Sequence, residues 1–295
     1  MSTSRRAGYA AAMGTVLIGA GFILLSRFAA KTTLTPYDML ALRLVGALTV
    51  VLPLSRGMPP GAWRDRRLWL LTLSGGFGYC LFIYLGVKLA PAAHAAILLP
   101  GLQPFLVALV VLAFSGRRPA RARWPGLALI GGGVACVGVP FFGGDFSAEV
   151  LAGDGLILVS SISWAIFAVQ GRTWGFDPWV QTRFVALAAT AVYLPVYLFW
   201  LPKGLDGVSA TVLLTQGAFQ GIASMILSMW LFLKAQSALG AEKVGALIAL
   251  NPVIAGVAAV PLLGEPLTGW LLAGLLGVSL GAYLSVRPLP APAAG

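Results

Sequence analysis

The stretch LQPFLVALVVLAFSGRRPARARWPGLALIGGG at residues 102–133 is echoed by LNPVIAGVAAVPLLGEPLTGWLLAGLLGVSLG at residues 250–281. Both stretches begin with a proline that follows an amide side chain, Gln103-Pro104 in the first and Asn251-Pro252 in the second. Each then runs through apolar residues to a glycine, a polar turn and a second apolar run. Internal similarity of this kind indicates that the chain is built from two related halves.

Earlier parts of the two halves also match. The segment LRLVGAL around Arg43 resembles TRFVALA around Arg183, and GAGFILLSR from Gly19 resembles SISWAIFAVQ from Ser161. These matches keep the same order along the chain as the first pair. We therefore expect one repeat at 1–145 and a second at 146–295.

The composition is that of a membrane protein. Hydrophobic residues make up 59% of the 295 residues and charged residues 10%, and the mean hydropathy is +0.90. A soluble domain of this length has too little interior for so much apolar surface, so the solvent is largely lipid. The net charge of +11 does not indicate a nucleic-acid partner, because the basic residues stand between apolar runs without aromatic interleaving or a binding motif. Cys80 and Cys136 lie inside apolar runs, so neither a disulfide framework nor a metal site is expected.

A helix needs about 20 mostly apolar residues to cross a bilayer. Ten windows meet this length and predict an all-α protein with ten membrane spans: 8–28, 36–55, 67–88, 91–113, 123–142, 153–172, 178–201, 211–235, 242–263 and 266–286. Each half holds five of them. Because five is odd, the second half enters the membrane in the opposite direction, which makes an inverted repeat around a central cavity.

The basic residues predict the orientation. With the N-terminus in the cytoplasm, the outer segments hold only Arg27, Lys31, Lys88 and Lys203. The inner segments hold fourteen: Arg5, Arg6, Arg56, Arg64, Arg66, Arg67, Arg117, Arg118, Arg121, Arg123, Arg172, Lys234, Lys243 and Arg287. Basic residues favour the cytoplasmic side, so both termini are expected in the cytoplasm of a bacterial-type inner membrane. The loop with Asp145, Glu149 and Asp154 is then expected outside.

Several landmarks together resemble the drug/metabolite transporter superfamily, EamA family. They are Pro36 seven residues before Arg43, Pro178 five before Arg183, Pro104 and Pro252 in the fourth and ninth windows, and GEPLTGW at 264–270. The resemblance covers nearly the whole chain. One departure is Gly-Arg-Arg-Pro at 116–119, where the family commonly has Gly-Glu.

This resemblance implies ten helices, with the first four of each half around a central cavity and the fifth of each half at the periphery. It also implies export of small molecules such as amino acids, nucleotide sugars or drugs. Within the family the chain looks most like the YddG-type exporters of aromatic amino acids. The expected function is therefore export of amino acids, aromatic ones preferred, by alternating access.

Ionisable groups inside a bilayer are costly and mark functional positions. Acidic residues are expected only at span ends, where Asp38, Asp154 and Glu265 lie. This disfavours a proton-coupled antiporter and predicts weak dependence on a pH gradient. Arg43 and Arg183 lie within spans, and the similarity of their positions favours a gating or structural role over substrate binding.

Four polar residues near helix starts and breaks are candidates for substrate contact. His94, the single histidine, has small neighbours and is expected near a cavity. Gln103 and Asn251 precede prolines that free backbone groups, which favours a break lining a cavity. The alternatives are a packed histidine and simple packing kinks. Ser163 belongs to a loosely polar face of the sixth window.

The remaining candidates are aromatic residues and a polar stripe. Tyr79 and Trp164 lie deep in their windows, where a flat apolar ligand can stack on them, although packing alone would also explain them. Gln220 and Ser224 stand four residues apart and predict a polar stripe facing a wet interior. The alternative is hydrogen bonding between helices.

Two other classes of protein compete with a transporter. A membrane enzyme would need a nucleophile with a base or a metal cluster, for which one histidine and no acid in mid-span provide little. A channel is disfavoured because the spans lack charged rings.

No cofactor or metal is expected, and the partners are a small-molecule substrate and lipid. The glycines at 131–133, 274, 277 and 281 fit close packing within one chain or between two copies.

Overall fold

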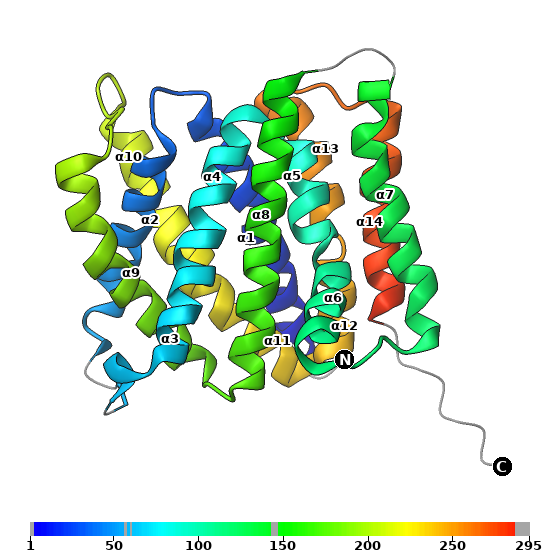
Figure 1. Cartoon of the computed structure of the whole chain (residues 1–295), viewed down its shortest axis with the longest axis horizontal. Coiled ribbons are helices and arrows are strands. Elements are labelled where there is room, and N and C mark those ends of the chain that lie inside the picture. Colours follow the sequence, from blue (N-terminus) through cyan, green and yellow to red (C-terminus); the bar gives the residue numbers. More distant parts are fainter. Residues whose placement is uncertain (1–2, 56–57, 60, 143–146, 287–295) are drawn as a thin grey trace.

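The computed structural model describes residues 3–55, 58–59, 61–142 and 147–286, and within these ranges every regular element is a helix (Figure 1). The predicted all-α class is confirmed for this part of the chain. The predicted boundary between the halves, at 145/146, falls outside the described residues, as do Arg56, Asp145 and Arg287.

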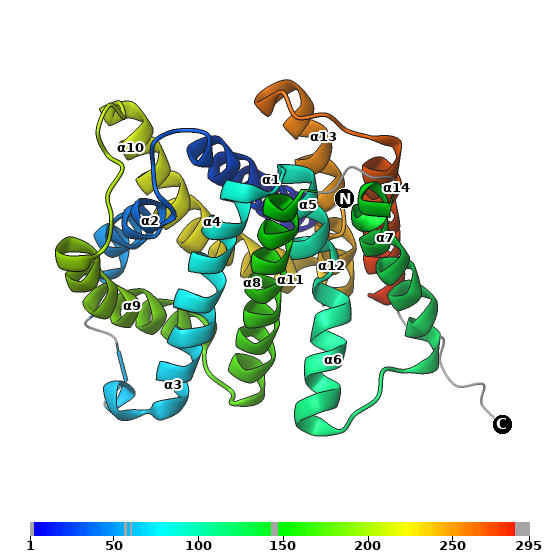
Figure 2. The same cartoon turned by 45° about the horizontal axis from the view of Figure 1, so that its top comes forward.

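The helices pack side by side in one bundle (Figures 1 and 2). Up to residue 142 the elements are α1 (Thr3–Ala30), α2 (Pro36–Val51), η2 (Ala62–Arg64), α3 (Arg66–Leu71), η3 (Thr72–Gly78), α4 (Tyr79–Leu89), α5 (Ala92–Ala96), η4 (Ile97–Gly101), α6 (Gln103–Ser115), η5 (Arg121–Arg123) and α7 (Trp124–Phe142). After the undescribed segment they are α8 (Ala148–Thr173), α9 (Pro178–Trp200), α10 (Ala210–Gln216), η6 (Gly217–Leu227), α11 (Ser228–Leu239), α12 (Ala241–Ile248), α13 (Asn251–Leu263) and α14 (Gly269–Ser285).

Several of these elements are parts of one long helix. Seven helical stretches are long and apolar enough to cross a membrane, and the count becomes eight if the bent pair Ala92–Gly101 and Gln103–Ser115 forms one span. The other two predicted spans correspond to α2, with 16 residues, and α14, with 17, which are both shorter than these stretches. The chain is thus a multi-pass membrane protein, and ten spans stays a prediction.

The helix of the sixth predicted window, α8, begins earlier than the sequence predicted. The sixth window began at residue 153 and left Glu149 in a loop, but α8 starts at Ala148, where the Ser147 hydroxyl accepts a hydrogen bond from the backbone N–H of Val150. A serine N-cap of this kind satisfies a free N–H at the helix start. Asp154 therefore lies about two turns inside α8, and its position at a span end stays a prediction.

Helices of the two halves alternate through the bundle. α1 packs against α11 and α13, while α8 packs against α4 and α6. α2 packs against η6 and α9 against η3, so each of these packings has a counterpart between the helices before residue 143 and those after residue 146. Three segments in the interior, η3, η4 and η6, are π-helical, with hydrogen bonds to the fifth residue along instead of the fourth.

The pair α7 and α14 lies together at one edge of the bundle (Figures 1 and 2). A Cβ atom at Gly133 would lie 2.9 Å from the Gly274 carbonyl oxygen, and one at Gly281 would lie 2.6 Å from that of Gly126. These glycines therefore let the two backbones touch. Of the glycines that the sequence singled out, those at 133, 274, 277 and 281 pack α7 against α14 within the chain, whereas Gly131 and Gly132 meet nothing within 4 Å.

Candidate functional site

A group of aromatic and polar side chains occupies the interior where α1, α2, α4, α8 and η6 meet. We call it the central cluster, and its members are Phe22, Arg43, Tyr79, Tyr84, Trp164, Gln220 and Ser224. The rings form a continuous row: Phe22 stacks on Tyr79 with 5.9 Å between ring centroids, and Tyr79 lies 4.7 Å from Trp164. Trp164 continues the row to Phe167 at 5.2 Å. The structure thus brings together Tyr79 and Trp164, two of the predicted substrate-contacting residues.

Arg43 is the charged member of the central cluster. Its side chain is buried, its Nη1 donates to the Ser224 hydroxyl at 3.3 Å, and its guanidinium lies 5.3 Å from the centre of the Phe22 ring. Tyr79 and Tyr84 are close enough to interact with its charge. Sequence reasoning favoured a gating or structural role for Arg43, yet the structure places it among the aromatic residues.

Gln220 is the centre of a buried hydrogen-bond network beside Arg43. The Tyr84 hydroxyl donates to Gln220 Oε1 at 3.3 Å, and Gln220 Nε2 donates to Ser26 Oγ at 3.1 Å and to Gln216 Oε1 at 3.3 Å. These contacts join η6 to α4 and α1, as the alternative of hydrogen bonding between helices predicted, and the wet interior stays a prediction. The assumed α-helical period of the polar stripe was wrong, because Gln220 and Ser224 belong to π-helical η6.

The two amide–proline pairs both stand at helix breaks. Pro104 and Pro252 lie in the first turns of α6 and α13, and the helix axis bends by 41° before Gln103. Gln103 Nε2 donates to the Ser161 carbonyl at 3.0 Å. In the described part of the chain, Gln103 Oε1 and Asn251 Oδ1 are buried without a hydrogen-bond partner, so both can accept a hydrogen bond from water or a ligand.

Three other predicted residues lie away from the row of rings or at its margin. Ser163, half-buried, packs against Gly78 of η3. His94 is buried in α5, and its Nδ1 lies 2.9 Å from Asp154 Oδ1, so it pairs with a carboxylate of α8. Arg183 donates from Nη1 to the Leu54 carbonyl and from Nε to the Trp179 carbonyl. That contact fits a structural role, and the two arginines therefore differ in spite of their matching sequence positions.

Glu265 joins the two halves at the end of the bundle that holds His94 and Asp38. It accepts from Arg27 Nε at 2.5 Å and from the Ala92 backbone N–H at 2.7 Å, and Lys31 Nζ lies 3.5 Å away. Arg27 also donates to the Val87 carbonyl. One buried carboxylate thus ties α1, α5 and the α13–α14 connection together.

We expect the substitution Glu265→Gln to lower the free energy of unfolding by about 2 kcal/mol or more, because it leaves the mostly buried Arg27 without its counter-charge. Asp65→Asn is the matched control: its ion pair with Arg67 is exposed, and asparagine still caps α3, so the change should stay below about 1 kcal/mol. Thermal unfolding of the purified protein in detergent measures both. Equal losses would contradict the bridging role of Glu265.

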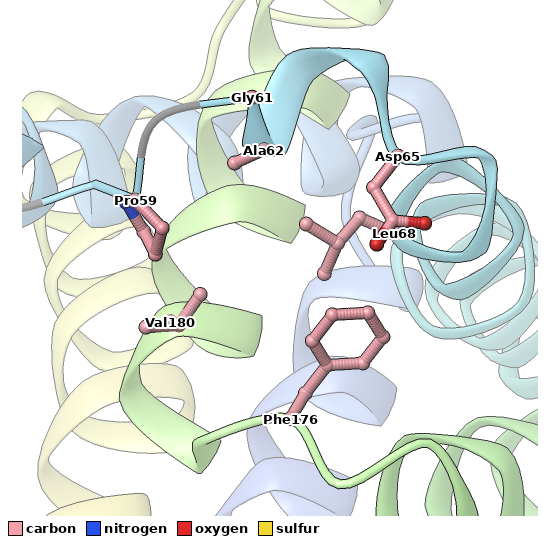
Figure 3. Close-up of a pocket in the computed structure, with 7 residues that line it drawn as sticks. All are labelled: Pro59, Gly61, Ala62, Asp65, Leu68, Phe176 and Val180. Atoms are coloured by element: carbon pink, nitrogen blue, oxygen red, sulfur yellow. The ribbon is translucent and has the colours of Figure 1, made fainter.

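At the opposite end, a pocket of about 190 Å³ lies between the segment before α3 and the start of α9 (Figure 3). Its lining is largely apolar, with Leu68, Phe176 and Val180 around Asp65. The side-chain hydrogen bond from Arg67 lowers the pKa of the Asp65 carboxyl. None of the predicted site residues lines this pocket, and the predicted central cavity stays a prediction.

Phe22, Tyr84 and Ser26 were not among the predicted site residues. The alignment of GAGFILLSR with SISWAIFAVQ matches Phe22 with Trp164. Because Trp164 was a predicted site residue, this match could have identified Phe22 as another. Nothing in the sequence indicated that Ser26 would meet Gln220. Within the described ranges, no three His, Cys, Asp or Glu side chains gather as metal ligands.

Comparisons with known proteins place this geometry in context. A family model described as the EamA-like transporter family matches twice, at residues 6–139 and 151–287. The threonine/homoserine exporter RhtA of Salmonella typhimurium (strain LT2) is 28% identical over 234 residues, 77% of this chain and 75% of that protein. RhtA of Escherichia coli (strain K12) is 29% identical over 231 residues, covering 76% and 74%.

Another relative and one solved structure extend the comparison. The aromatic amino acid exporter YddG of Ancylobacter novellus is 30% identical over 197 residues, 63% of this chain and 68% of that protein. A crystal structure with 22% identity matches with a TM-score of 0.60, covering 96% of this chain and 97% of the other. At that identity the match concerns the fold alone.

Proposed function

The chain belongs to the EamA-like transporter family, and from this premise we propose that it exports amino acids, aromatic ones preferred, by alternating access through the central cluster. The observation that carries the proposal is the row of rings from Phe22 through Tyr79 to Trp164 in the interior, beside polar groups. Aromatic side chains stack on such rings in offset or tilted geometry, each pair contributing about 1 kcal/mol beyond burial. A relative whose name is aromatic amino acid exporter adds support.

A second candidate is export of small hydroxylated amino acids. The relatives named threonine/homoserine exporters match a larger share of this chain than the aromatic exporter does. The buried acceptors Gln103 Oε1 and Asn251 Oδ1 could receive a substrate hydroxyl. The row of aromatic rings favours the first candidate.

The proposed architecture is ten spans in two inverted repeats, 1–145 and 146–295, in a bacterial-type inner membrane with both termini in the cytoplasm. The exchange of contacts between the halves and the helix breaks at Gln103 and Asn251 support the repeat. Gly116 and Gly264, at corresponding positions, also end their helices with φ of 64° and 66°. The Glu265 end would then face outward.

Flux in proteoliposomes tests the proposal. We expect saturable counterflow of labelled L-phenylalanine and L-tryptophan, several-fold above L-threonine, and persistence of the flux without a pH gradient. Trp164→Ala should lower phenylalanine flux about tenfold and leave threonine flux nearly unchanged, because it removes a ring from the row. The matched control is Trp270→Ala, whose side chain is exposed on α14.

Two results would count against it. Robust threonine flux with no saturable aromatic flux would replace the first candidate by the second. Flux that collapses when the pH gradient is removed would contradict uncoupled transport. The His94–Asp154 pair would then be the candidate site of proton coupling.

A further inference from the structure

Arg43 is a buried cation without a counter-charge in the described part of the chain. Arg43 is 6% exposed, and no described carboxylate lies within 4.0 Å of its guanidinium. The buried carboxylates have other partners. Asp38 accepts from Tyr197 and Gly204, Asp154 pairs with His94, and Glu265 pairs with Arg27.

The contacts of Arg43 satisfy only part of its donor capacity. A guanidinium has five N–H donors, and the acceptors beside Arg43 are two neutral hydroxyls, of Ser224 and Tyr84, besides the Phe22 ring. A buried charge is costly unless it is paired and hydrogen-bonded. In a membrane protein such a residue points to a partner that arrives from solution.

The chemistry of that partner follows from the guanidinium. Its planar fork matches a carboxylate with two parallel hydrogen bonds, which are among the strongest in proteins. The Phe22 ring lies near one side of the cation, and Tyr79 stacks on Phe22 and reaches Trp164. A carboxylate held by Arg43 leaves the rest of the ligand beside these rings.

The groups around Arg43 offer no matching site for a second charge. Tyr79, Tyr84, Gln220 and Ser224 carry no charge, so the neighbours of Arg43 include no carboxylate that could pair with an ammonium group. An ammonium group can donate hydrogen bonds to the hydroxyl and amide oxygens among them but finds no ion pair. The two charges of an amino acid are therefore recognised unequally.

We propose that Arg43 binds the carboxylate of the substrate and that the site requires this carboxylate but not the ammonium group, so that 2-oxo acids and deaminated acids are also ligands. This proposal rests on the proposed function, because it concerns the same central cluster. It extends the substrate class from amino acids to monocarboxylates with similar side chains.

Competition on the wild-type protein tests the ligand class without any substitution. Phenylpyruvate should inhibit L-phenylalanine counterflow within about tenfold of unlabelled phenylalanine, whereas phenethylamine, which lacks the carboxylate, should be at least about 100-fold weaker. If threonine is the better substrate, 3-hydroxybutyrate and 1-amino-2-propanol replace these two probes. Inhibition by the amine at the level of the acid would overturn the proposal.

Substitutions then test the residue. Arg43→Gln should lower flux at low substrate concentration about 100-fold, and Arg43→Lys, which keeps the charge but loses the fork, should lower it less. Arg183→Gln is the matched control, because Arg183 caps backbone carbonyls outside the central cluster. Phenylpyruvate should raise the unfolding temperature of the wild type and of Arg183→Gln but not of Arg43→Gln. Equal stabilisation of all three would overturn the assignment to Arg43.

The outcomes separate this inference from the function on which it rests. Amino acid flux together with weak inhibition by the acids would remove the inference and leave the exporter standing. Absence of flux for phenylalanine, tryptophan and threonine would remove the proposed function, and the inference with it.

Discussion

Replacing Asp38 by alanine is expected to lower the free energy of unfolding by about 3 kcal/mol or more, one of the largest losses for any single polar side chain here. Asp38 has no exposed surface, and its carboxylate accepts hydrogen bonds from the Thr35 N–H and hydroxyl, the Tyr197 hydroxyl and the Gly204 N–H. Alanine leaves the Thr35 and Gly204 N–H groups and the Tyr197 hydroxyl without this acceptor, while the Thr35 hydroxyl keeps the Pro202 carbonyl at 3.3 Å. It also removes the capping box that begins α2.

The control is Asp177→Ala at the start of α9. Asp177 also caps a helix, accepting from the Trp179 and Val180 N–H groups, but it is exposed, so water replaces it and the cost should be about 1 kcal/mol. Thermal unfolding in detergent, followed by the fraction of monodisperse protein, compares the two variants. Similar losses would show that burial of Asp38 adds nothing beyond capping.

The second large effect is expected from Gly46→Val in α2. A Cβ atom at this position would lie 2.0 Å from the Gly217 carbonyl oxygen, and one at Gly221 would lie 2.3 Å from the Ala47 nitrogen. The backbones of α2 and η6 therefore touch on both sides, and neither atom can move as a flexible side chain could. We expect a loss of more than about 3 kcal/mol and little folded protein.

Gly132→Val in α7 is the matched control, since a Cβ atom there meets nothing within 4 Å and the residue is exposed. Its yield after membrane extraction should match that of the wild type. A Gly46→Val protein with normal yield and unfolding temperature would contradict the close approach of α2 and η6.

Much of the fold was predictable because lipid imposes a strong constraint on sequence. Long apolar runs gave helix positions within a few residues, and Gln103-Pro104 and Asn251-Pro252 marked helix breaks because proline lacks an N–H. The π-helical segments were not predictable. The sequence carries no local signal for them, and they pack against residues far apart in the chain, as Gly75 of η3 does against Phe167.

The site was only partly predictable for a related reason. Tyr79, Trp164, Gln220 and Ser224 were identified from their depth and polarity, but their contacts were not. Matching sequence around Arg43 and Arg183 implied one shared role, whereas the structure gives Arg43 an aromatic environment and Arg183 backbone carbonyls. The difference arises from neighbours on other helices, which a repeat within one chain does not specify.

The π-helical segments have a mechanical consequence. A helix that contains one extra residue in a turn keeps its hydrogen bonds when that turn slides along the backbone, and each side chain that it passes rotates by roughly 100°. In η6 such sliding would carry Gln220 or Ser224 away from Tyr84 and Arg43 while α10 and α11 stay anchored. The side chains that η6 presents to a substrate would then change by rotation of one helical segment, without a hinge.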